Sequence, residues 1–389
     1  METLWKNRRQ ALEEAHLNRS LRVSGVGPVV ETPDGEKLIF CSNDYLGMAR
    51  SPAVANAAQD ELKKGIGAGA SRLVSGNFGW HEQLEHEFAA FVKKADSVLF
   101  PSGYQANVGA ISALAGPDDV IFSDRLCHAS IIDGCRLSRA AVEIFEHNDV
   151  ADLRRLLEKY RDTNCGKMVI TEGIFSMDGD MPPLREICDA ATDAGAVVYL
   201  DEAHSLGILG PQGRGLAASL GLSDAVAVVV GTFGKAVGVS GACVAGSVNA
   251  AMLLKSTARS LMFTTASPPA LARAVCESLM LIESADDKRR SLYRNIRLFK
   301  TLAASAGVPL ISSDSPIQPV LIGDARRVME ISNHLWHTGL FVQGIRPPTV
   351  PSGTERLRIT ITAAHTDTQI QRLVNELKRC GAAEQGECK

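Results

Sequence analysis

The sequence has no excess of charge of one sign and no paired-cysteine motif. Among its 389 residues, 41 Lys and Arg stand against 44 Asp and Glu, and this near balance gives no reason to expect a nucleic-acid partner. The nine cysteines are scattered, odd in number and free of any C-x-x-C spacing. Such a pattern favours reduced thiols in a cytoplasmic protein over a disulfide framework or a zinc site, so no metal is expected.

The chain also lacks the apolar segments that mark a signal peptide or a membrane span. Its first nine residues run into a charged amphipathic helix with no apolar core. Residues 236–254 carry no charge and approach the length of a membrane span, but they contain three glycines, two serines and an asparagine. A packed interior segment is therefore expected there, and a membrane partner is not.

Two short motifs resemble cofactor or metal sites but stand in the wrong context. Residues 65–70 resemble the G-x-G-x-x-A fingerprint of dinucleotide-binding folds, yet a helical pattern at 54–64 precedes them where that fold requires a strand. His81 and His86 resemble the histidine pair of a zinc-protease helix, but they are five residues apart and do not share one helical face. Both classes of enzyme are therefore disfavoured, and no P-loop or G-x-S-x-G elbow occurs.

Short apolar segments alternate with helical patterns through the middle of the chain, and there are no internal repeats. Residues 150–160 and 184–194, for example, have helical patterns. This alternation predicts an α/β fold with a mostly parallel central sheet covered by helices. The expected strands cover residues 97–100, 120–122, 142–145, 168–171, 197–200, 226–230 and 242–245.

The two ends of the chain have different patterns and are expected to form separate parts. Residues 1–45 read as a helix followed by a hairpin, and a large domain that contains the predicted sheet follows at 46–265. Residues 266–389 read as a linking helical region and a small C-terminal α+β domain that starts near residue 317. In this last part we expect helices at 326–337 and 366–379 and strands at 340–342 and 357–362.

Three side chains typical of pyridoxal-phosphate chemistry stand just beyond two of the expected core strands. Lys235 follows the apolar run at 225–230, and Asp201 and His204 follow the apolar run at 196–200. A lysine can form a Schiff base with pyridoxal 5′-phosphate, an acidic group can pair with its ring nitrogen, and an imidazole can hold its ring. Each residue alone is more often an exposed loop side chain, and it is their combination that favours the cofactor.

Other strand ends offer groups that suit the rest of such a cofactor. Residues 101–107 follow an expected strand and open a helix, whose first backbone N–H groups would seat a phosphate. Thr232 would add a hydroxyl to the same phosphate, and His128, after a further strand, would stack on the ring. At this point the alternatives stay open: an ordinary strand-to-helix turn at 101–107 and a surface histidine at the start of a helix.

Seven segments spread over nearly the whole chain match the pattern of one enzyme family. They are C-S-N-D-Y-L-G at 41–47, D-R-L-C-H-A-S at 124–130, H-N-D at 147–149, T-E-G-I-F-S-M-D-G-D at 171–180, D-E-A-H at 201–204, G-R-G at 213–215 and T-F-G-K at 232–235. With these segments the chain resembles the α-oxoamine synthases, which are pyridoxal-phosphate enzymes of fold type I (aspartate-aminotransferase-like). It departs from the family pattern at Tyr104, where phenylalanine is common, and at Glu202, where aspartate is common.

The resemblance implies a site built around pyridoxal 5′-phosphate. Lys235 would hold the cofactor as a Schiff base, Asp201 would keep its ring nitrogen protonated, and His128 would stack on its ring. The further implied contacts are those of His204 and Ser176 with the ring oxygen, of Gly103, Tyr104 and Thr232 with the phosphate, and of Thr264 and Thr265 with the phosphate across the interface of a homodimer.

The segment at 345–351 resembles the branch of the family that acts in biotin biosynthesis. That branch condenses L-alanine with a pimeloyl thioester and releases carbon dioxide, and the thiol carrier is coenzyme A or a carrier protein. The resemblance implies that Arg346 clamps the amino-acid carboxylate beside Thr349, with Asn43 and His128 also at the substrate.

The pimeloyl group ends in a free carboxylate, which is costly to bury without a partner. Arg22, near the matched N-terminal helix, is a candidate for that partner. A solvated surface arginine is the alternative, and the sequence alone leaves the two open.

Three other functions are compatible with parts of this pattern. A sister enzyme, glycine C-acetyltransferase, condenses glycine with acetyl-coenzyme A, but the segment at 345–351 argues against it. An aminotransferase of the same fold is disfavoured by the segments at 176–180 and 233–235. A non-catalytic scaffold descended from such an enzyme would have lost Lys235 or Asp201, and both are present.

Overall fold

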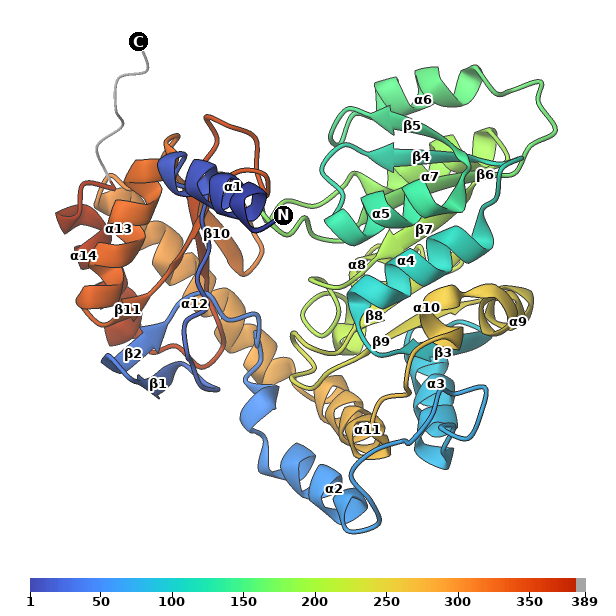
Figure 1. The fold of residues 1–389 in the computed structure, drawn as a ribbon, viewed down its shortest axis with the longest axis horizontal. Coiled ribbons are helices and arrows are strands. Elements are labelled where there is room, and N and C mark those ends of the chain that lie inside the picture. The colour runs from blue at the N-terminus through green and yellow to red at the C-terminus, as the bar shows by residue number, and fades with distance from the viewer. Residues whose placement is uncertain (383–389) are drawn as a thin grey trace. The chain divides into compact units, whose positions relative to one another are not determined.

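The structure, a computed structural model, describes residues 1–382, and the chain forms two compact units (Figure 1). The larger unit comprises Leu46–Ser176 and Met181–Asp287. The smaller unit comprises Met1–Tyr45, Met177–Asp180 and the chain from Lys288 onwards. Cys388 and the end of the expected C-terminal domain lie outside the described residues.

The larger unit is built on one seven-stranded sheet with the order β3-β9-β8-β7-β6-β4-β5. All neighbouring strands are parallel except at β9, which runs antiparallel to both β3 and β8. These strands coincide with the seven apolar segments of the sequence, so the prediction of a mostly parallel sheet is confirmed. The strands are β3 (Asp96–Phe100), β4 (Val120–Asp124), β5 (Ala141–Phe145), β6 (Lys167–Glu172), β7 (Val197–Asp201), β8 (Val228–Thr232) and β9 (Ala242–Gly246).

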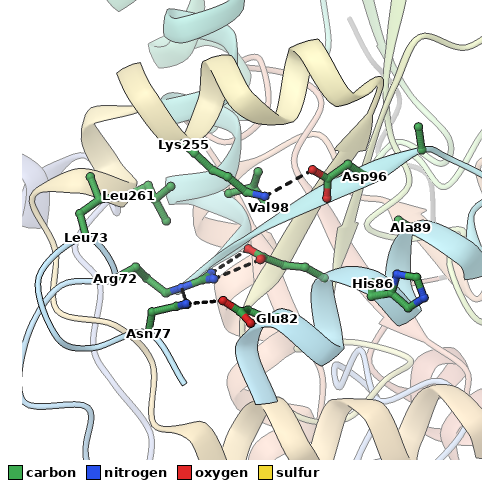
Figure 2. Close-up of a pocket in the computed structure, with 12 residues that line it drawn as sticks. Arg72, Leu73, Asn77, Glu82, His86, Ala89, Asp96, Val98, Lys255 and Leu261 are labelled. Atoms are coloured by element: carbon green, nitrogen blue, oxygen red, sulfur yellow. Dashed lines mark hydrogen bonds and ion pairs between the residues drawn. The ribbon is translucent and has the colours of Figure 1, made fainter. Parts of the chain in front are cut away.

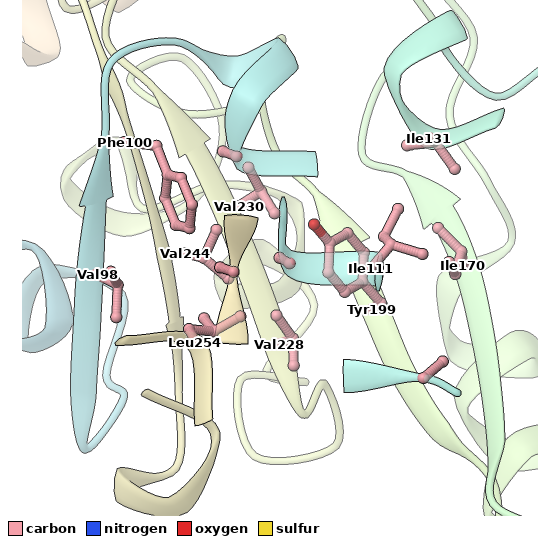
Figure 3. Packing of buried hydrophobic residues seen from close by; sticks show 14 of the residues in the cluster. Val98, Phe100, Ile111, Ile131, Ile170, Tyr199, Val228, Val230, Val244 and Leu254 are labelled. Carbon is pink, nitrogen blue, oxygen red and sulfur yellow. The ribbon is translucent and has the colours of Figure 1, made fainter. Parts of the chain in front are cut away.

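Helices connect and cover these strands, because parallel neighbours require crossover connections. Residues of the sheet pack with residues of α4, α5, α9 and α10 into one apolar cluster that includes Phe100, Ile111, Tyr199, Val230 and Val244 (Figure 3). β9 is buried along its whole length, which is why its sequence carries no polar side chain and does not alternate. The helices are η1 (Met48–Arg50), α2 (Pro52–Leu62), α3 (Gly79–Phe91), α4 (Gly103–Leu114), α5 (Ala129–Ser138), α6 (Val150–Glu158), α7 (Leu184–Asp193), η2 (Pro211–Gly213), α8 (Leu216–Ser219), α9 (Val248–Thr257), α10 (Arg259–Met262) and α11 (Pro269–Glu283).

The parallel strands β4, β6, β7 and β8 end at the same edge of the sheet. Their last residues are Asp124, Glu172, Asp201 and Thr232. In open α/β sheets, ligands bind beyond the carboxyl ends of the strands, so this edge is where a site is expected. The glycine-rich segment at 65–70, in contrast, follows α2 and not a strand, which rules out the dinucleotide fingerprint.

The smaller unit contains two three-stranded sheets. One sheet has the order β1-β2-β11 and the other the order β10-β13-β12. The predicted helices at 326–337 and 366–379 are confirmed as α13 and α14, whereas β12 was not predicted. The elements are α1 (Glu2–Glu14), β1 (Val29–Thr32), β2 (Gly35–Ile39), α12 (Asp286–Ser305, which starts in the larger unit), β10 (Ile317–Leu321), α13 (Ala325–His337), β11 (Leu340–Phe341), β12 (Gln343–Ile345), β13 (Arg356–Thr360) and α14 (Asp367–Arg379).

No helix within residues 1–382 is both long enough and apolar enough to cross a membrane. The uncharged segment at 236–254 instead divides between a loop, β9 and the first part of α9. Its alanine, valine and glycine residues in β9 are buried in the sheet, as a packed interior requires.

Candidate active site

Asp201, the last residue of β7, is a buried carboxylate with firm hydrogen-bond partners. Only 4% of the residue is exposed. Its Oδ2 accepts a hydrogen bond from Nδ2 of Asn107 at 2.7 Å, and its Oδ1 accepts one from the backbone N–H of Ala203 at 2.9 Å. Two donors of this kind fix the orientation of a carboxyl group. Asp201 is therefore held in one position at the sheet edge.

Glu172, the last residue of β6, lies next to Asp201 in the strand register. It is buried, and its carboxyl group accepts the backbone N–H of His128. Burial and the neighbouring charge of Asp201 raise the pKa of Glu172 well above its usual value. Glu172 was not predicted as a site residue, because its closeness to Asp201 follows from the strand register and not from local sequence.

His128 caps the N-terminus of α5 and remains exposed at the sheet edge. Its Nδ1 accepts a hydrogen bond from the backbone N–H of Ser130 at 3.2 Å and lies 2.8 Å from the Ser130 hydroxyl. Desolvation lowers the pKa of His128, the charge of Lys235 lowers it further, and Asp201 opposes both. A neutral imidazole with one open face is well suited to pack against an aromatic ring.

Lys235 follows β8 by three residues and is half-buried. Its charge affects the pKa of both His128 and Glu172, which places the three side chains in one electrostatic neighbourhood. The chain just beyond the lysine is held closely: a Cβ atom added to Gly238 would lie 2.3 Å from the backbone nitrogen of Ala49. The lysine loop is thus packed against the backbone of η1, which fixes its path.

The carboxyl group of Glu202 has different hydrogen-bond partners from that of its neighbour Asp201, and a different role. It is fully buried, and its carboxyl group accepts the backbone N–H groups of Leu216 and Ala217 at 2.8 and 2.9 Å and the hydroxyl of Ser205. Glu202 therefore holds the N-terminal turn of α8. Successive side chains alternate in direction along a strand, so only one of the two acids can face a given ligand.

Gly103, Tyr104 and Thr232 form a cradle at the start of α4. Ser102 caps the helix by accepting the backbone N–H of Gln105 at 3.2 Å, and the first N–H groups of a helix have no intrahelical partner. A Cβ atom added to Gly103 would lie 2.5 Å from Cγ2 of Thr232, so the backbone of Gly103 approaches the Thr232 side chain as only glycine allows. Backbone donors, a hydroxyl and a positive helix end are groups that hold a phosphate dianion.

The remaining predicted cofactor residues also belong to the larger unit. His204 is buried three positions after Asp201, and Ser176 is half-buried four positions after β6. Thr264 and Thr265 lie in the segment between α10 and α11, and Thr265 is exposed. The donor set of this unit, a lysine, a buried carboxylate, an open imidazole and a phosphate cradle, fits pyridoxal 5′-phosphate.

Arg346, in the smaller unit, follows β12 and is only 5% exposed. It donates hydrogen bonds to the backbone oxygen of Asn18 and to Sδ of Met329, while its Nε is buried with no hydrogen-bond partner among the described residues. Burial and the nearby charge of Arg19 lower the pKa of Arg346. A buried cation with an unused donor and a second cation beside it is a favourable place for an anion.

Arg19 was not predicted as a site residue. Its Nη2 donates to the backbone oxygen of Pro347 at 3.2 Å and to Oγ1 of Thr349 at 3.4 Å. The two contacting segments are 330 positions apart in the chain, so no local pattern could have revealed the contact. Arg19 therefore joins Arg346 and Thr349 in one group.

Arg22 and Asn43 are each held by other side chains of the smaller unit. Nη2 of Arg22 donates to Oδ1 of Asn333 at 2.7 Å, and its guanidinium lies 4.5 Å from the ring centroid of Trp336. Oδ1 of Asn43 accepts a hydrogen bond from Nη1 of Arg358 at 3.1 Å. Both residues are half-buried, and their other donors and acceptors can still reach a substrate.

A pocket of about 380 Å³ in the larger unit is a separate feature (Figure 2). Arg72 forms a two-pronged ion pair with Glu85 at 2.7 and 3.1 Å, and Asn77 joins Arg72 to Glu82. The described lining includes none of the predicted site residues. Its buried charges are paired with each other, so we interpret these residues as an ion-pair network that stabilises the fold and not as a ligand site.

No group of His, Cys, Asp and Glu within residues 1–382 is arranged to hold a metal ion. His81 instead accepts the backbone N–H of Phe78 at 3.2 Å through Nδ1, and its Nε2 lies 2.9 Å from the backbone oxygen of Ser267. It holds the start of α3 and packs inside the protein.

Comparison with known proteins assigns the family. Residues 35–377 match the family of class I and II aminotransferases. The 8-amino-7-oxononanoate synthase of Marinobacter nauticus is 46% identical over 371 residues, which cover 94% of this chain and 93% of that protein. The chain belongs to the 8-amino-7-oxononanoate synthase family. Its fold is that of the pyridoxal-phosphate enzymes of fold type I, as predicted.

Solved structures agree with this family and its fold. Serine palmitoyltransferase from S. paucimobilis, solved with a bound pyridoxal-phosphate–myriocin adduct, is 32% identical, with a TM-score of 0.92 and coverage of 97% of both chains. The 8-amino-7-oxononanoate synthase of Francisella tularensis is 29% identical, with a TM-score of 0.76 over 88% of this chain and 97% of that one. The 8-amino-7-oxononanoate synthase family thus shares its fold with an enzyme that binds the cofactor predicted from Lys235 and Asp201.

Proposed function

We propose that this protein condenses L-alanine with a pimeloyl thioester to give 8-amino-7-oxononanoate, carbon dioxide and the free thiol carrier. The reaction is a step of biotin biosynthesis, and pyridoxal 5′-phosphate is the cofactor. The observation that carries the proposal is the joint position of Lys235, Asp201 and His128 beyond the carboxyl ends of parallel strands, in a chain of this family. When bound, the cofactor supplies an electron-accepting ring for the α-carbon of the amino acid.

The residues of the larger unit divide the work on the cofactor and the amino acid. Lys235 carries the cofactor and moves the proton at the α-carbon, acting first as base and then as acid. Asp201, held by two donors, keeps the proton on the ring nitrogen. His128 covers one face of the ring and excludes water from it. His204 and Ser176 hold the ring oxygen.

The cradle at the start of α4 seats the phosphate. Gly103 and Tyr104 supply backbone N–H groups, and Thr232 supplies a hydroxyl. In the proposed homodimer, Thr264 and Thr265 of one subunit reach the phosphate bound by the other. Their position in the loop between α10 and α11, with Thr265 exposed, supports this role.

The residues of the smaller unit recognise the ends of the substrates. Arg346, with a buried and unused Nε, and Thr349 hold the carboxylate of alanine. Asn43 contributes to the same substrate contact, and Arg22 pairs with the far carboxylate of the pimeloyl group. The donor is either pimeloyl-coenzyme A or a pimeloyl-carrier protein. The cytoplasm is the proposed location, and the eight described cysteines are free thiols, as a reducing compartment requires.

Product mass analysis tests the proposal. The purified protein is offered alanine, glycine or serine, each with pimeloyl, acetyl or palmitoyl thioesters. We expect efficient turnover only for alanine with the pimeloyl donor, and a product with the mass of 8-amino-7-oxononanoate. Preferred turnover of glycine with the acetyl donor would show the sister activity instead. Preferred turnover of serine with the palmitoyl donor would show instead that this chain has the activity of its structural relative, serine palmitoyltransferase.

A further inference from the structure

A chain of hydrogen bonds runs through the larger unit behind the predicted cofactor residues. The hydroxyl of Tyr199 donates to Oδ1 of Asn107 at 2.9 Å. Nδ2 of Asn107 donates to Oδ2 of Asp201 at 2.7 Å and to Oγ of Ser130 at 2.9 Å. The Ser130 hydroxyl in turn lies 2.8 Å from Nδ1 of His128. Both polar atoms of the Asn107 side chain, Oδ1 and Nδ2, therefore take part in one buried network.

The directions of these hydrogen bonds are fixed by the chemistry of each group. An asparagine Nδ2 can only donate, so Oγ of Ser130 accepts from it and has its own hydrogen available for Nδ1 of His128. Nδ1 also accepts the backbone N–H of Ser130, which leaves the ring proton of a neutral His128 on Nε2. The network thus specifies one tautomer of His128 and one orientation of Asp201 at the same time.

The position of Asn107 is itself tightly constrained. Asn107 is 2% exposed and lies on α4, four residues after Gly103 and therefore on the same face of the helix. A Cβ atom added to Gly134 of α5 would lie 2.9 Å from the backbone oxygen of Asn107, so the two helices are in close contact there. One rigid helix carries both the phosphate cradle and the partner of Asp201.

We propose that Asn107 is a positioning residue that fixes the orientation of Asp201 towards the cofactor's ring nitrogen and, through Ser130, the orientation of His128 towards the ring. It acts through these two residues and does not touch the reacting atoms. The proposal rests on the cofactor assignment of the proposed function but not on the identity of the acyl donor. Loss of the Asn107 amide should therefore weaken both the contact of Asp201 with the ring nitrogen and the contact of His128 with the ring.

The main test compares Asn107→Leu with the wild-type protein. The variant keeps a similar volume but removes both donors and the acceptor. We expect the dissociation constant for pyridoxal 5′-phosphate, measured by titration of the cofactor-free protein, to rise about tenfold or more, the scale of a lost hydrogen bond to a charged group. The visible absorption spectrum of the bound cofactor should change, and kcat should fall more than KM rises.

Asn295→Leu is the matched control. Asn295 is also 2% exposed, and its Nδ2 donates to the backbone oxygens of Thr362 and His365 at 3.0 and 2.8 Å, in the smaller unit. It should lower the midpoint of thermal unfolding as Asn107→Leu does, without changing cofactor affinity or spectrum. If the two variants lose only stability, and cofactor affinity and spectrum match wild type in both, Asn107 is an ordinary buried asparagine and the proposal is overturned.

Two milder variants decide the matter if Asn107→Leu does not fold. Tyr199→Phe removes only the hydroxyl that holds Oδ1 of Asn107, and Ser130→Ala removes only the link to His128. Each should change the absorption spectrum of the bound cofactor, and wild-type spectra and affinities in both would overturn the proposal. The cofactor measurements need no acyl donor, so a failure of the proposed substrate assignment would be seen separately, in the product analysis.

Discussion

Glu172 and Asp201 end neighbouring parallel strands in the same register, so two buried carboxyl groups lie side by side at the edge of the sheet. Two adjacent buried acids cannot both ionise cheaply. The oxygens of Asp201 accept hydrogen bonds from Asn107 and Ala203, while burial and the charge of Asp201 raise the pKa of Glu172. The direction of this shift favours a protonated Glu172 beside Asp201.

This arrangement gives a prediction for the pH dependence of stability. As the pH rises above the usual Glu value of 4.5, the unfolded chain releases a proton that the folded chain keeps on Glu172, so this residue makes the free energy of unfolding fall with pH. Glu172→Gln removes that titration. Denaturant unfolding from pH 4.5 to neutrality should show the variant gaining stability relative to wild type as the pH rises. A constant difference across this range would contradict a protonated Glu172.

Lys235→Ala should abolish turnover, because the residue that carries the cofactor and moves the α-carbon proton is lost. Wild-type protein should be yellow, and borohydride reduction followed by peptide mapping should find the cofactor attached to Lys235. Lys255→Ala is a suitable control, since this lysine pairs with Asp96 in the structural pocket. An adduct on another lysine would refute the assignment.

The two adjacent acids at the end of β7 should respond differently to loss of charge. Asp201→Asn should retain part of its cofactor affinity but lose about tenfold to a hundredfold in kcat, because a charge-assisted hydrogen bond to the ring nitrogen is lost. Glu202→Gln should leave kcat near wild type and lower the free energy of unfolding by about 1–3 kcal/mol, because its oxygens hold the backbone of α8. Steady-state kinetics and denaturant unfolding of both variants check this, and equal losses of kcat would be the contrary result.

Donor selectivity tests the role of Arg22. Arg22→Ala should reduce kcat/KM for the pimeloyl donor by a factor that corresponds to about 2 kcal/mol, while a donor ending in a methyl group is barely affected. Arg19→Ala, from the same segment, is the comparison, because Arg19 contacts Thr349 and adds its charge near Arg346. A selective loss in the Arg19 variant alone would move the assignment to that residue. Equal losses for both donors would show an effect on folding or on the shared part of the donor.

The proposed homodimer predicts that activity depends on assembly. Sedimentation at assay concentrations should show two chains per particle, and Thr264→Ala combined with Thr265→Ala should weaken cofactor binding about tenfold, as expected for lost contacts to a charged phosphate. A fully active monomer would rule out a shared active site.

The central sheet could be predicted because most of its strands, unlike the exposed edge strand β5, are buried on both faces. The apolar runs before Asp201 and Lys235 are long enough, and uniform enough, to indicate core strands. β12 was missed since it is only three residues long and contains Gly344. The start of β8 is two residues later than predicted, which places Thr232 at the end of the strand.

Residues that act through long-range contacts were harder to find. Asp201 and Lys235 stand out locally because each follows an apolar run. Glu172 acquires its role only through pairing of β6 with β7, and Arg19 only through a contact with Thr349 at the other end of the chain. Such partners are set by tertiary packing, which a single sequence does not display.

Helix α4 carries Gly103 at its start and Asn107 four residues later, about 6 Å further along the helix axis. In the proposed site these two positions serve opposite ends of one small molecule, its anionic group and its ring nitrogen. The hydrogen bonds of the helix keep the distance between these two positions constant. The site therefore fits only ligands whose anionic group and ring nitrogen are separated by a matching distance. Cofactor analogues that lack the phosphate, or carry it on a longer arm, would make only one of the two contacts. Selectivity for the correct cofactor would then come from the fixed length of the helix backbone between the two positions.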